Sequence, residues 1–366
     1  MKIAIVHDYL NQFGGAERVV EALHELYPNA PIYTSIYDRN RLPESFLRMD
    51  IRTTFMQNLP FVFPLFRYYL LLYPLAFSNL DLSEYDVVLS SSSAFAKGFR
   101  KNPGQLHICY CYTPMRFVYR FLEYVDKENF PWWLKNLLPV LLAPIRQWDL
   151  ANNRSVDAFL AISGAIAERI KQIYGRKSDI IFPPVETQFF RPSNIDRDYY
   201  LIVSRLNHYK RIDLAVEAFN ELDMPLKIIG DGPARKSLEK SARPNVEFLG
   251  RLGDDQVACY LSECRALIFP GEEDFGIVPV EAMACGRPVI AYNAAGAKET
   301  VIDGKTGILF DPQTVAALVQ AVKRFKFELF DKNKIREHAL RFDKNVFKQK
   351  IEEFVKGKYE EKFGNN

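Results

Sequence analysis

The sequence predicts an α/β protein of two doubly wound domains, each with a parallel sheet. Short apolar runs alternate with helical segments, which is the pattern of parallel strands covered by helices. The alternation stops in the proline-rich, polar stretch 182–198 and then starts again. The length of 366 residues also exceeds what one hydrophobic core supports.

The first domain is expected over residues 1–187. It opens with the apolar strand KIAIVHD, a turn at Gly14 and Gly15, and a helical pattern that Pro28 ends. Two further apolar runs, DVVLSSSSAFAKGF and LHICYCYTP, end in polar or turn residues. These units favour a parallel sheet.

The second domain is expected over residues 188–345. Its strands are YYLIVSRL, PLKIIGDG, VEFLG, RALIFPG and RPVIAYN, and helical segments separate them. Residues 346–366 form a last helix with an apolar stripe at Phe347, Ile351 and Phe354, which needs a partner surface. We therefore expect this helix to return to the N-terminal domain.

Composition and charge exclude several classes of protein. The net charge of +3, from 48 basic and 45 acidic residues, argues against a nucleic-acid binder. Five cysteines without framework spacing favour reduced thiols and a cytoplasmic location. No apolar run is long enough for a membrane-spanning helix. No cluster of His, Cys and Asp has metal-ligand spacing, so we expect no metal and no cofactor.

The second domain carries the strongest functional signal, an acid pair that flanks a strand-to-helix junction. Glu273 and Glu281 lie eight residues apart, and the break between them exposes backbone amides and a positive helix end to a phosphate. The two carboxylates can each accept from sugar hydroxyls on opposite sides of that phosphate. The spacing suits a nucleotide-sugar. The donor-site candidates here are Asp274, Phe275, Gly276, Ile277, Val278 and Glu281.

Two cations follow the strand YYLIVSRL. Arg205 and Lys210 lie at the carboxyl end of this strand, where open α/β sheets bind ligands. Together they can neutralise a diphosphate leaving group without a metal. Gly230 and Gly232 form another turn at a strand end, which we place on the nucleoside side of the donor.

These residues resemble the retaining GT-B glycosyltransferases, specifically the large family four. The matches run in the expected order through SRLNHYKR, IIGDGP, VEFLGRL, the acid pair and GAKETVIDGKTGILF, and GGAER fits the family's glycine loop. The resemblance implies a GT-B fold, with two Rossmann-like domains facing a central cleft, and metal-independent transfer of a hexosyl group with retention. It implies that Arg205 and Lys210 hold the diphosphate, that Glu273 contacts the transferred sugar and that Glu281 binds ribose. Gly14 and Gly15 would face the phosphates, and the backbone near Leu249, Gly250 and Arg251 would contact the base.

The N-terminal half resembles a narrower group. KIAIVHDYLNQFGGAERV, YCYTPMRFVY and RIKQIYGR are similar to mannosyltransferases that build O-antigen, capsule or exopolysaccharide from GDP-mannose on a polyprenyl-linked acceptor. That group would have a histidine where this chain has Tyr112. The acceptor candidates are His7, Asp8, Tyr112 and Arg116. His7 and Tyr112 could instead be core residues, and Asp8 could form an internal ion pair with Arg116.

Other interpretations stay open. The donor could be a UDP-sugar, and the same architecture occurs in nucleotide-sugar epimerases and in carbohydrate-binding proteins without activity. The aromatic segments 61–77 and 130–148 are either core or a peripheral contact with the inner face of the membrane. On the second view, changing Trp132 and Trp133 to Ser should weaken vesicle binding.

Overall fold

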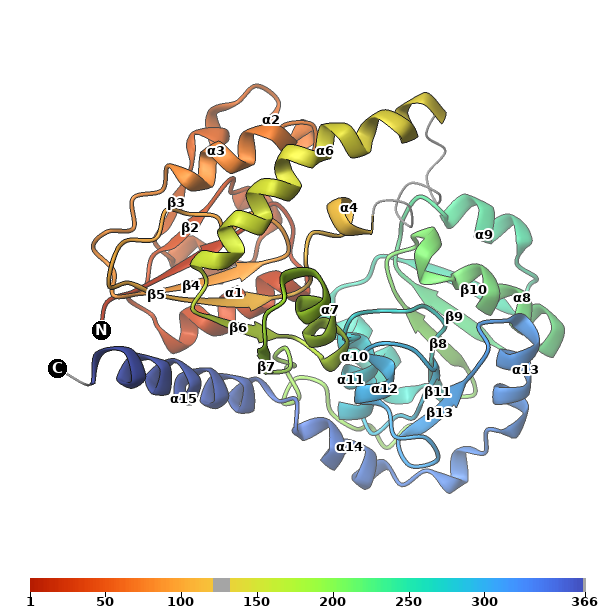
Figure 1. The fold of residues 1–366 in the computed structure, drawn as a ribbon. Coiled ribbons are helices and arrows are strands. Elements are labelled where there is room, and N and C mark those ends of the chain that lie inside the picture. Colours follow the sequence, from red (N-terminus) through yellow and green to blue (C-terminus); the bar gives the residue numbers. More distant parts are fainter. Residues whose placement is uncertain (121–131, 365–366) are drawn as a thin grey trace. The chain divides into compact units, whose positions relative to one another are not determined.

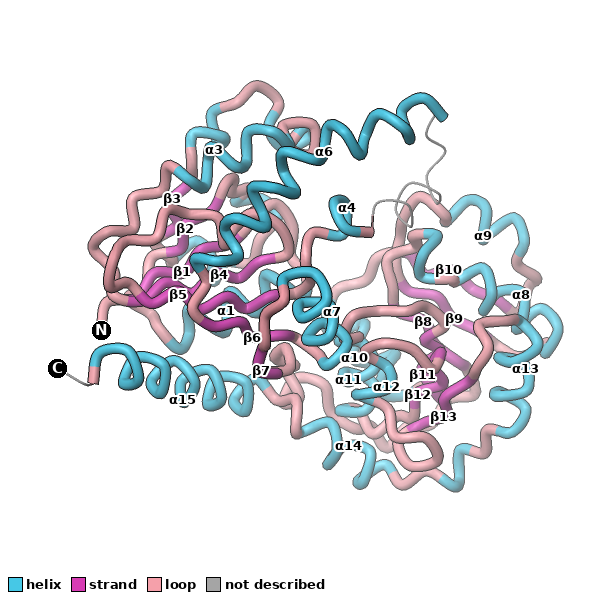
Figure 2. Tube along the Cα trace, in the orientation of Figure 1, coloured by secondary structure: helices cyan, strands magenta, loops and turns pink. Residues whose placement is uncertain are grey.

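The computed structural model describes residues 1–120 and 132–364, with side chains except at 132–139 and 141. It divides into two compact units. Unit 1 comprises Met1–Pro184 and Phe347–Asn366, and unit 2 comprises Val185–Val346. Each unit has a central parallel sheet flanked by helices (Figure 2).

Unit 1 is built on a seven-stranded sheet of order β3-β2-β1-β4-β5-β6-β7, in which all pairs are parallel. The chain order reverses between β1 and β4, which is the topological switch point where such sheets bind ligands. Its strands are β1 (Ile3–His7), β2 (Ile32–Thr34), β3 (Ile51–Thr53), β4 (Val87–Ser92), β5 (Leu106–Cys111), β6 (Ala158–Ala161) and β7 (Ser178–Ile180). Its helices include α1 (Gly15–Leu26), α2 (Val62–Leu65), α3 (Tyr73–Ser78), α4 (Arg116–Tyr119), α6 (Trp132–Asn152) and α7 (Gly164–Tyr174).

Unit 2 repeats the architecture with six parallel strands in the order β10-β9-β8-β11-β12-β13. Its switch point lies between β8 and β11. The strands are β8 (Tyr200–Val203), β9 (Leu226–Ile229), β10 (Val246–Gly250), β11 (Ala266–Phe269), β12 (Val289–Tyr292) and β13 (Gly307–Phe310). The helices are α8 (Ile212–Leu222), α9 (Arg235–Ser241), α10 (Asp254–Glu263), α11 (Ile277–Ala284), α12 (Ala297–Thr300), α13 (Val315–Arg324) and α14 (Lys332–Leu340).

The last helix, α15 (Lys344–Phe363), lies along unit 1 (Figure 1). Phe347 is buried, and its ring meets Tyr110 of β5 edge-on, with 5.6 Å between the ring centroids. At the other end of the helix, the ammonium of Lys362 donates to the backbone carbonyl of Gln105 over 2.7 Å. Burial of the apolar stripe is thus the physical reason for this packing.

The carboxylate of Asp8 organises the loop that follows β4. It accepts hydrogen bonds from four successive backbone amides, Ser93 to Ala96, at 2.6–3.0 Å, and from the Ser93 hydroxyl at 3.0 Å. The side chain is almost fully buried. These bonds, and not the ion pair with Arg116 considered from the sequence, fix Asp8. The residue joins the two strands that flank the switch point of unit 1.

The aromatic segment 61–77 has a buried face and an exposed face. Val62, Tyr73, Ala76 and Phe77 are buried in the core of unit 1. A second set of apolar side chains, which we call the outer apolar face, is 54–83% exposed; it comprises Phe61, Tyr68, Leu71 and Leu75.

The second aromatic segment, 130–148, is described only in part. Its residues 130 and 131 and the side chains of Trp132 and Trp133 lie outside the described residues. Among its described side chains, Leu142 and Ile145 are buried and Val140 is exposed. In the part of the chain that the structure covers, no helix combines the length and apolar character needed to cross a membrane.

A buried histidine in β5 makes the stability of unit 1 depend on pH. The Nε2 atom of His107 lies 2.8 Å from the Ser90 hydroxyl, and the ring packs on Phe99. Burial lowers the pKa of His107 to about 3 from 6.5. Because the folded pKa is the lower one, the unfolded chain binds more protons between these values, and stability is lost as the pH falls below 6.5.

We therefore expect His107→Gln, which can keep the bond to Ser90, to flatten the acid side of the stability profile. The native protein should lose up to about 1.4 kcal/mol more per pH unit than the variant in this window. Denaturant midpoints measured from pH 7 to pH 4 test this, with the exposed His208 changed to Gln as the control. If the free energy of unfolding falls equally steeply with pH in the native protein, His107→Gln and His208→Gln, the predicted role of His107 is contradicted.

Candidate functional site

The switch point of unit 2 brings together one predicted cation and one predicted acid. Lys210 ends the short 3₁₀ helix His208–Lys210 after β8, and Glu273 lies in the loop after β11. Their side chains form an ion pair, with exposed fractions of 13% and 25%. Residues 63 positions apart in sequence therefore meet where the strand order reverses, at the edge to which parallel strands present their carboxyl ends.

Arg205, the other predicted cation, lies in the loop between β8 and that 3₁₀ helix, and its side chain is exposed. Among the described residues, its guanidinium has no ion-pair or hydrogen-bond partner. A guanidinium without a charge partner, five residues before the largely buried ammonium of Lys210, suits a doubly charged diphosphate.

The glycine turn after β9 packs against the loop that carries Arg205. Gly230 has a φ of +133°, and a methyl group there would lie 1.8 Å from the backbone oxygen of Ser204. The amide of Leu206 donates to the carbonyl of Asp231, and the amide of Ala234 donates to the carbonyl of Leu206. Gly230 and its neighbour Gly232 therefore serve close backbone packing, which fixes the loop that carries Arg205.

The helix α11 begins at Ile277 with no side chain capping its first turn. Gly276, the N-cap residue, has a φ of +84°, which favours glycine. The first-turn amides, among them those of Ile277 and Val278, can thus bind an anion. Glu281 follows in the second turn and is only 5% exposed. Asp274 and Phe275, between Glu273 and this helix, are buried.

Two residues that were not predicted from the sequence hold the acidic loop in place. Gly296, after β12, donates its amide to the carbonyl of Glu273 over 2.9 Å. A methyl group at Gly296 would lie 2.2 Å from the backbone oxygen of Phe275. Gln313 donates to the carbonyl of Pro270 over 2.8 Å. The one sequence feature that marks this contact is the glycine of GAKET, because a close backbone approach requires a residue without a side chain.

The predicted base contact lies at the same edge of the sheet. Leu249 and Gly250 end β10, and Arg251 follows with an exposed side chain. The amide of Gly230 donates to the carbonyl of Gly250 over 2.7 Å. The loops after β9 and β10 are therefore tied together, next to the loop of Arg205.

Unit 1 has its own cluster of predicted residues at the carboxyl end of β1. Gly14 is the N-cap of α1, without a side-chain cap, and Gly15 is the first residue of that helix. Tyr112 follows β5, and its hydroxyl donates to the carbonyl of Ala16, which joins β5 to the first turn of α1. Burial raises the pKa of Tyr112 well above its ordinary value, so the phenol stays protonated.

His7 and Arg116 complete the predicted acceptor set. His7 is the last residue of β1 and is 2% exposed. Arg116 begins α4 and has an exposed side chain. Asp8, the fourth member, uses its carboxylate to hold the loop after β4.

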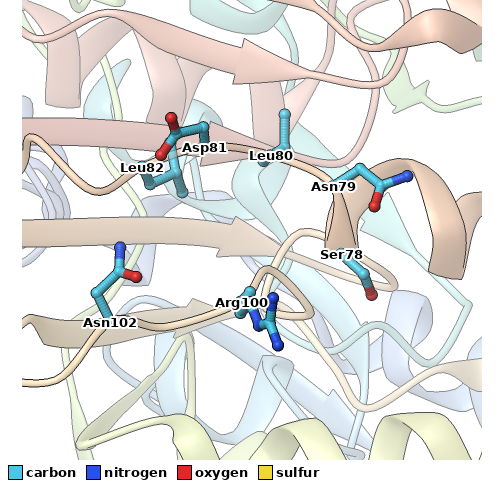
Figure 3. A pocket seen from close by; sticks show the side chains of 7 residues that line it. All are labelled: Ser78, Asn79, Leu80, Asp81, Leu82, Arg100 and Asn102. Carbon is cyan, nitrogen blue, oxygen red and sulfur yellow. The ribbon is translucent and has the colours of Figure 1, made fainter.

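Two surface hollows lie away from these switch points. One, of about 330 Å³, is lined by Ser78, Asn79, Leu80, Asp81, Leu82, Arg100 and Asn102 (Figure 3). It lies at the residues that precede β4 and β5, which is the amino-end edge of the unit 1 sheet. The other, of about 720 Å³, lies beside the start of β8 in unit 2. Neither is lined by a predicted site residue. Within residues 1–120 and 132–364, no group of three or more His, Cys, Asp and Glu side chains could hold a metal.

The second half of the chain is similar to a known protein family. Residues 185–349 match the family described as Glycosyl transferases group 1. The matched range covers unit 2 and includes both cations, the acid pair and the loops that support them.

Curated relatives match about half of the chain. An uncharacterized glycosyltransferase of Methanocaldococcus jannaschii is 29% identical over 56% of this chain and 60% of its own length. A GDP-mannose-dependent alpha-(1-6)-phosphatidylinositol monomannoside mannosyltransferase of Mycolicibacterium smegmatis is 29% identical over 51% of this chain and 56% of its own. The matched regions thus cover less than two thirds of these relatives.

A solved structure matches the whole fold. HepE of Anabaena, crystallised with UDP, superposes with a TM-score of 0.72 at 19% identity, over 98% of this chain and 100% of its own. At this identity the likeness shows the fold alone. The predicted fold class, α/β with two Rossmann-like domains of the GT-B type, is confirmed.

Proposed function

We propose that the protein is a retaining glycosyltransferase that moves a mannosyl group from GDP-mannose to a glycan acceptor in cell-surface polysaccharide synthesis. The observation that carries the proposal is the ion pair of Lys210 and Glu273 at the switch point of unit 2, with Arg205 in the loop that leads to Lys210 and the uncapped helix α11 shortly after Glu273. A site with two cations and a free helix end is suited to a diphosphate, and the adjacent acids suit sugar hydroxyls. A purely carbohydrate-binding protein has no need to neutralise a leaving group.

In the proposed reaction, the residues stabilise the departing nucleoside diphosphate. The acceptor oxygen bonds to the anomeric carbon on the face from which the phosphate oxygen leaves, and the acceptor's proton passes to that phosphate oxygen. Negative charge grows on the diphosphate as its bond to the sugar breaks, and Arg205 and Lys210 offset it. Glu273 holds a hydroxyl of the transferred sugar, and Glu281 holds the ribose.

This arrangement needs no metal, because two side-chain cations and the helix end supply the positive charge. We therefore propose that the enzyme uses no cofactor and that its turnover is the same with and without EDTA. A loss of turnover in EDTA, restored by a divalent cation, would contradict this part of the proposal.

The donor has two candidates. The name of the mycobacterial relative supports GDP-mannose, and the UDP bound to HepE supports a UDP-sugar. Incubation with GDP-mannose and with UDP-glucose, without any acceptor, separates them, since such a site should slowly hydrolyse its own donor. Release of GDP alone supports the proposal, whereas release of UDP alone names the alternative. Hydrolysis of neither would refute a glycosyltransferase with these donors.

We further propose that the acceptor is lipid-linked and that the cytoplasmic enzyme binds the inner membrane face peripherally. The outer apolar face of unit 1 supports this proposal. It presents two aromatic and two leucine side chains to solvent, and Arg67 is the one charged residue between positions 55 and 80. Exposed aromatic and leucine side chains beside a cation are suited to a membrane interface.

We expect the change of Phe61, Tyr68 and Leu71 to Ser to reduce binding to vesicles of phosphatidylglycerol in a flotation assay. The three side chains are 61–83% exposed, so the fold should be kept. Leu329→Ser, at a leucine of unit 2 that is 75% exposed, is the matched control and should bind like the native protein. If the native protein stays in the soluble fraction, the membrane contact is refuted and a soluble acceptor is favoured.

A further inference from the structure

His7 is held at the switch point of unit 1 by one residue of the neighbouring strand. His7 ends β1 and pairs in register with Ser91 of β4. Its Nδ1 atom lies 3.1 Å from the backbone oxygen of Ser91 and 3.0 Å from the Ser91 hydroxyl. The Ser91 hydroxyl in turn lies 2.7 Å from the hydroxyl of Tyr112. Three residues from β1, β4 and the end of β5 thus form a continuous hydrogen-bond chain.

The hydrogen-bond chain ends at two carbonyl oxygens, those of Ala16 and Ser91, and these ends determine which atom carries each proton. A carbonyl oxygen only accepts, so the Tyr112 hydroxyl must donate to the carbonyl of Ala16, 3.0 Å away. The Ser91 hydroxyl must then donate to Tyr112, because the phenol has no second proton. Nδ1 of His7 therefore carries a proton, which it donates to both oxygens of Ser91.

This assignment fixes the tautomer of the imidazole. A neutral histidine with a proton on Nδ1 has a lone pair on Nε2, which can only accept a hydrogen bond. Among the described residues, none donates to Nε2. The side chain of His7 is 98% buried, and polar atoms of buried side chains normally have a hydrogen-bond partner. His7 lies at the edge of the sheet where ligands bind, so a ligand can supply the partner of Nε2.

We propose that Nε2 of His7 accepts a hydrogen bond from a hydroxyl of the acceptor sugar, and that Ser91 and Tyr112 are positioning residues that fix its tautomer. The proposal rests on the proposed function, because it takes the acceptor to be a sugar. It also gives Tyr112 a different role from the one expected. The Tyr112 hydroxyl is fully engaged with Ala16 and Ser91, so it acts on the acceptor only through His7.

The tautomer can be measured directly in the full-length protein by two-bond ¹H–¹⁵N correlation spectra of the histidine rings. The chain has only five histidines, and His7→Gln identifies the signal of His7 by its loss. We expect the native protein to show the Nδ1–H tautomer. The Nε2–H tautomer, which free histidine prefers, would overturn the proposal.

Two variants then test the positioning role. Tyr112→Phe frees the Ser91 hydroxyl to donate to Nδ1, so the Nε2–H tautomer should appear in the spectrum. Adding Ser91→Ala to Tyr112→Phe removes that donor and leaves only the Ser91 carbonyl, so Nδ1–H should return. If Tyr112 had a purely structural role, adding Ser91→Ala would not restore the Nδ1–H tautomer. An unchanged tautomer in Tyr112→Phe would remove it from the positioning set.

The acceptor role is tested with methyl α-mannoside as the probe sugar, in the presence of GDP. The Nε2 signal should move upfield on saturation, because that atom gains a hydrogen bond. Transfer from GDP-mannose to the probe should fall about tenfold in His7→Phe, mainly through KM. No movement of the signal, together with native transfer in the variant, would overturn the proposal. Hydrolysis of GDP-mannose by the native protein without the probe tests the proposed function separately.

Discussion

Replacing Lys210 or Arg205 with alanine is expected to lower turnover by about 10²–10³-fold. The physical reason is that the negative charge on the diphosphate grows as the sugar leaves, so a cation there binds the transition state more strongly than the bound donor. The KM for the acceptor should change little. Steady-state rates with GDP-mannose and an acceptor, at several concentrations of each, measure both effects.

The ion pair between Lys210 and Glu273 calls for two controls. Lys236→Ala removes an exposed lysine from α9 in the same unit and should keep native turnover. Lys210→Ala also leaves the carboxylate of Glu273 without its partner, and the double variant with Glu273→Gln removes that charge. If the double variant recovers turnover, the unpaired carboxylate of Glu273 caused the loss of turnover in Lys210→Ala, and Lys210 does not act on the diphosphate.

The site in unit 2 could be predicted because its chemistry lies in short contiguous motifs. The acid pair spans one strand-to-helix junction, and parallel strands carry their functional side chains at one edge. The helix after this junction begins at Ile277, four residues after Glu273. What the sequence could not show is that Gly296 holds the loop of Glu273, because that contact depends on the packing of two loops that follow different strands.

The cluster in unit 1 was less predictable for a different physical reason. Ser91 lies 84 residues after His7, and its hydroxyl matters only because the two strands pair in register. Four of the five hydrogen bonds to Asp8 come from backbone amides, which every residue except proline has, so no side-chain pattern predicts them. The members of the outer apolar face are seven, three and four residues apart, as on one face of a helix, but the segment contains Pro64 and Pro74 and forms short helices instead of a continuous one.

Asp8→Asn is expected to destabilise unit 1 by about 3–6 kcal/mol. The native carboxylate accepts from four buried amides and one hydroxyl, with two of these bonds on Oδ1 and three on Oδ2. An asparagine has nearly the same shape, but its NH₂ group would face at least two backbone N–H donors. Hydrogen bonds to a charged group contribute about 1.5–3 kcal/mol each, so the loss of two gives this estimate.

The test compares Asp8→Asn with Asp86→Asn in denaturant unfolding. Asp86 also accepts a backbone amide, that of Lys2 over 2.7 Å, but its side chain is 45% exposed, so water can replace the bond. That control should lose less than about 1 kcal/mol. Hydrogen exchange adds a local measurement, because the amides of residues 93–96 should lose protection in Asp8→Asn and keep it in the control. Native midpoint and native protection in Asp8→Asn would show that the loop after β4 is held by other contacts, and Asp8 would again be free to bind the acceptor.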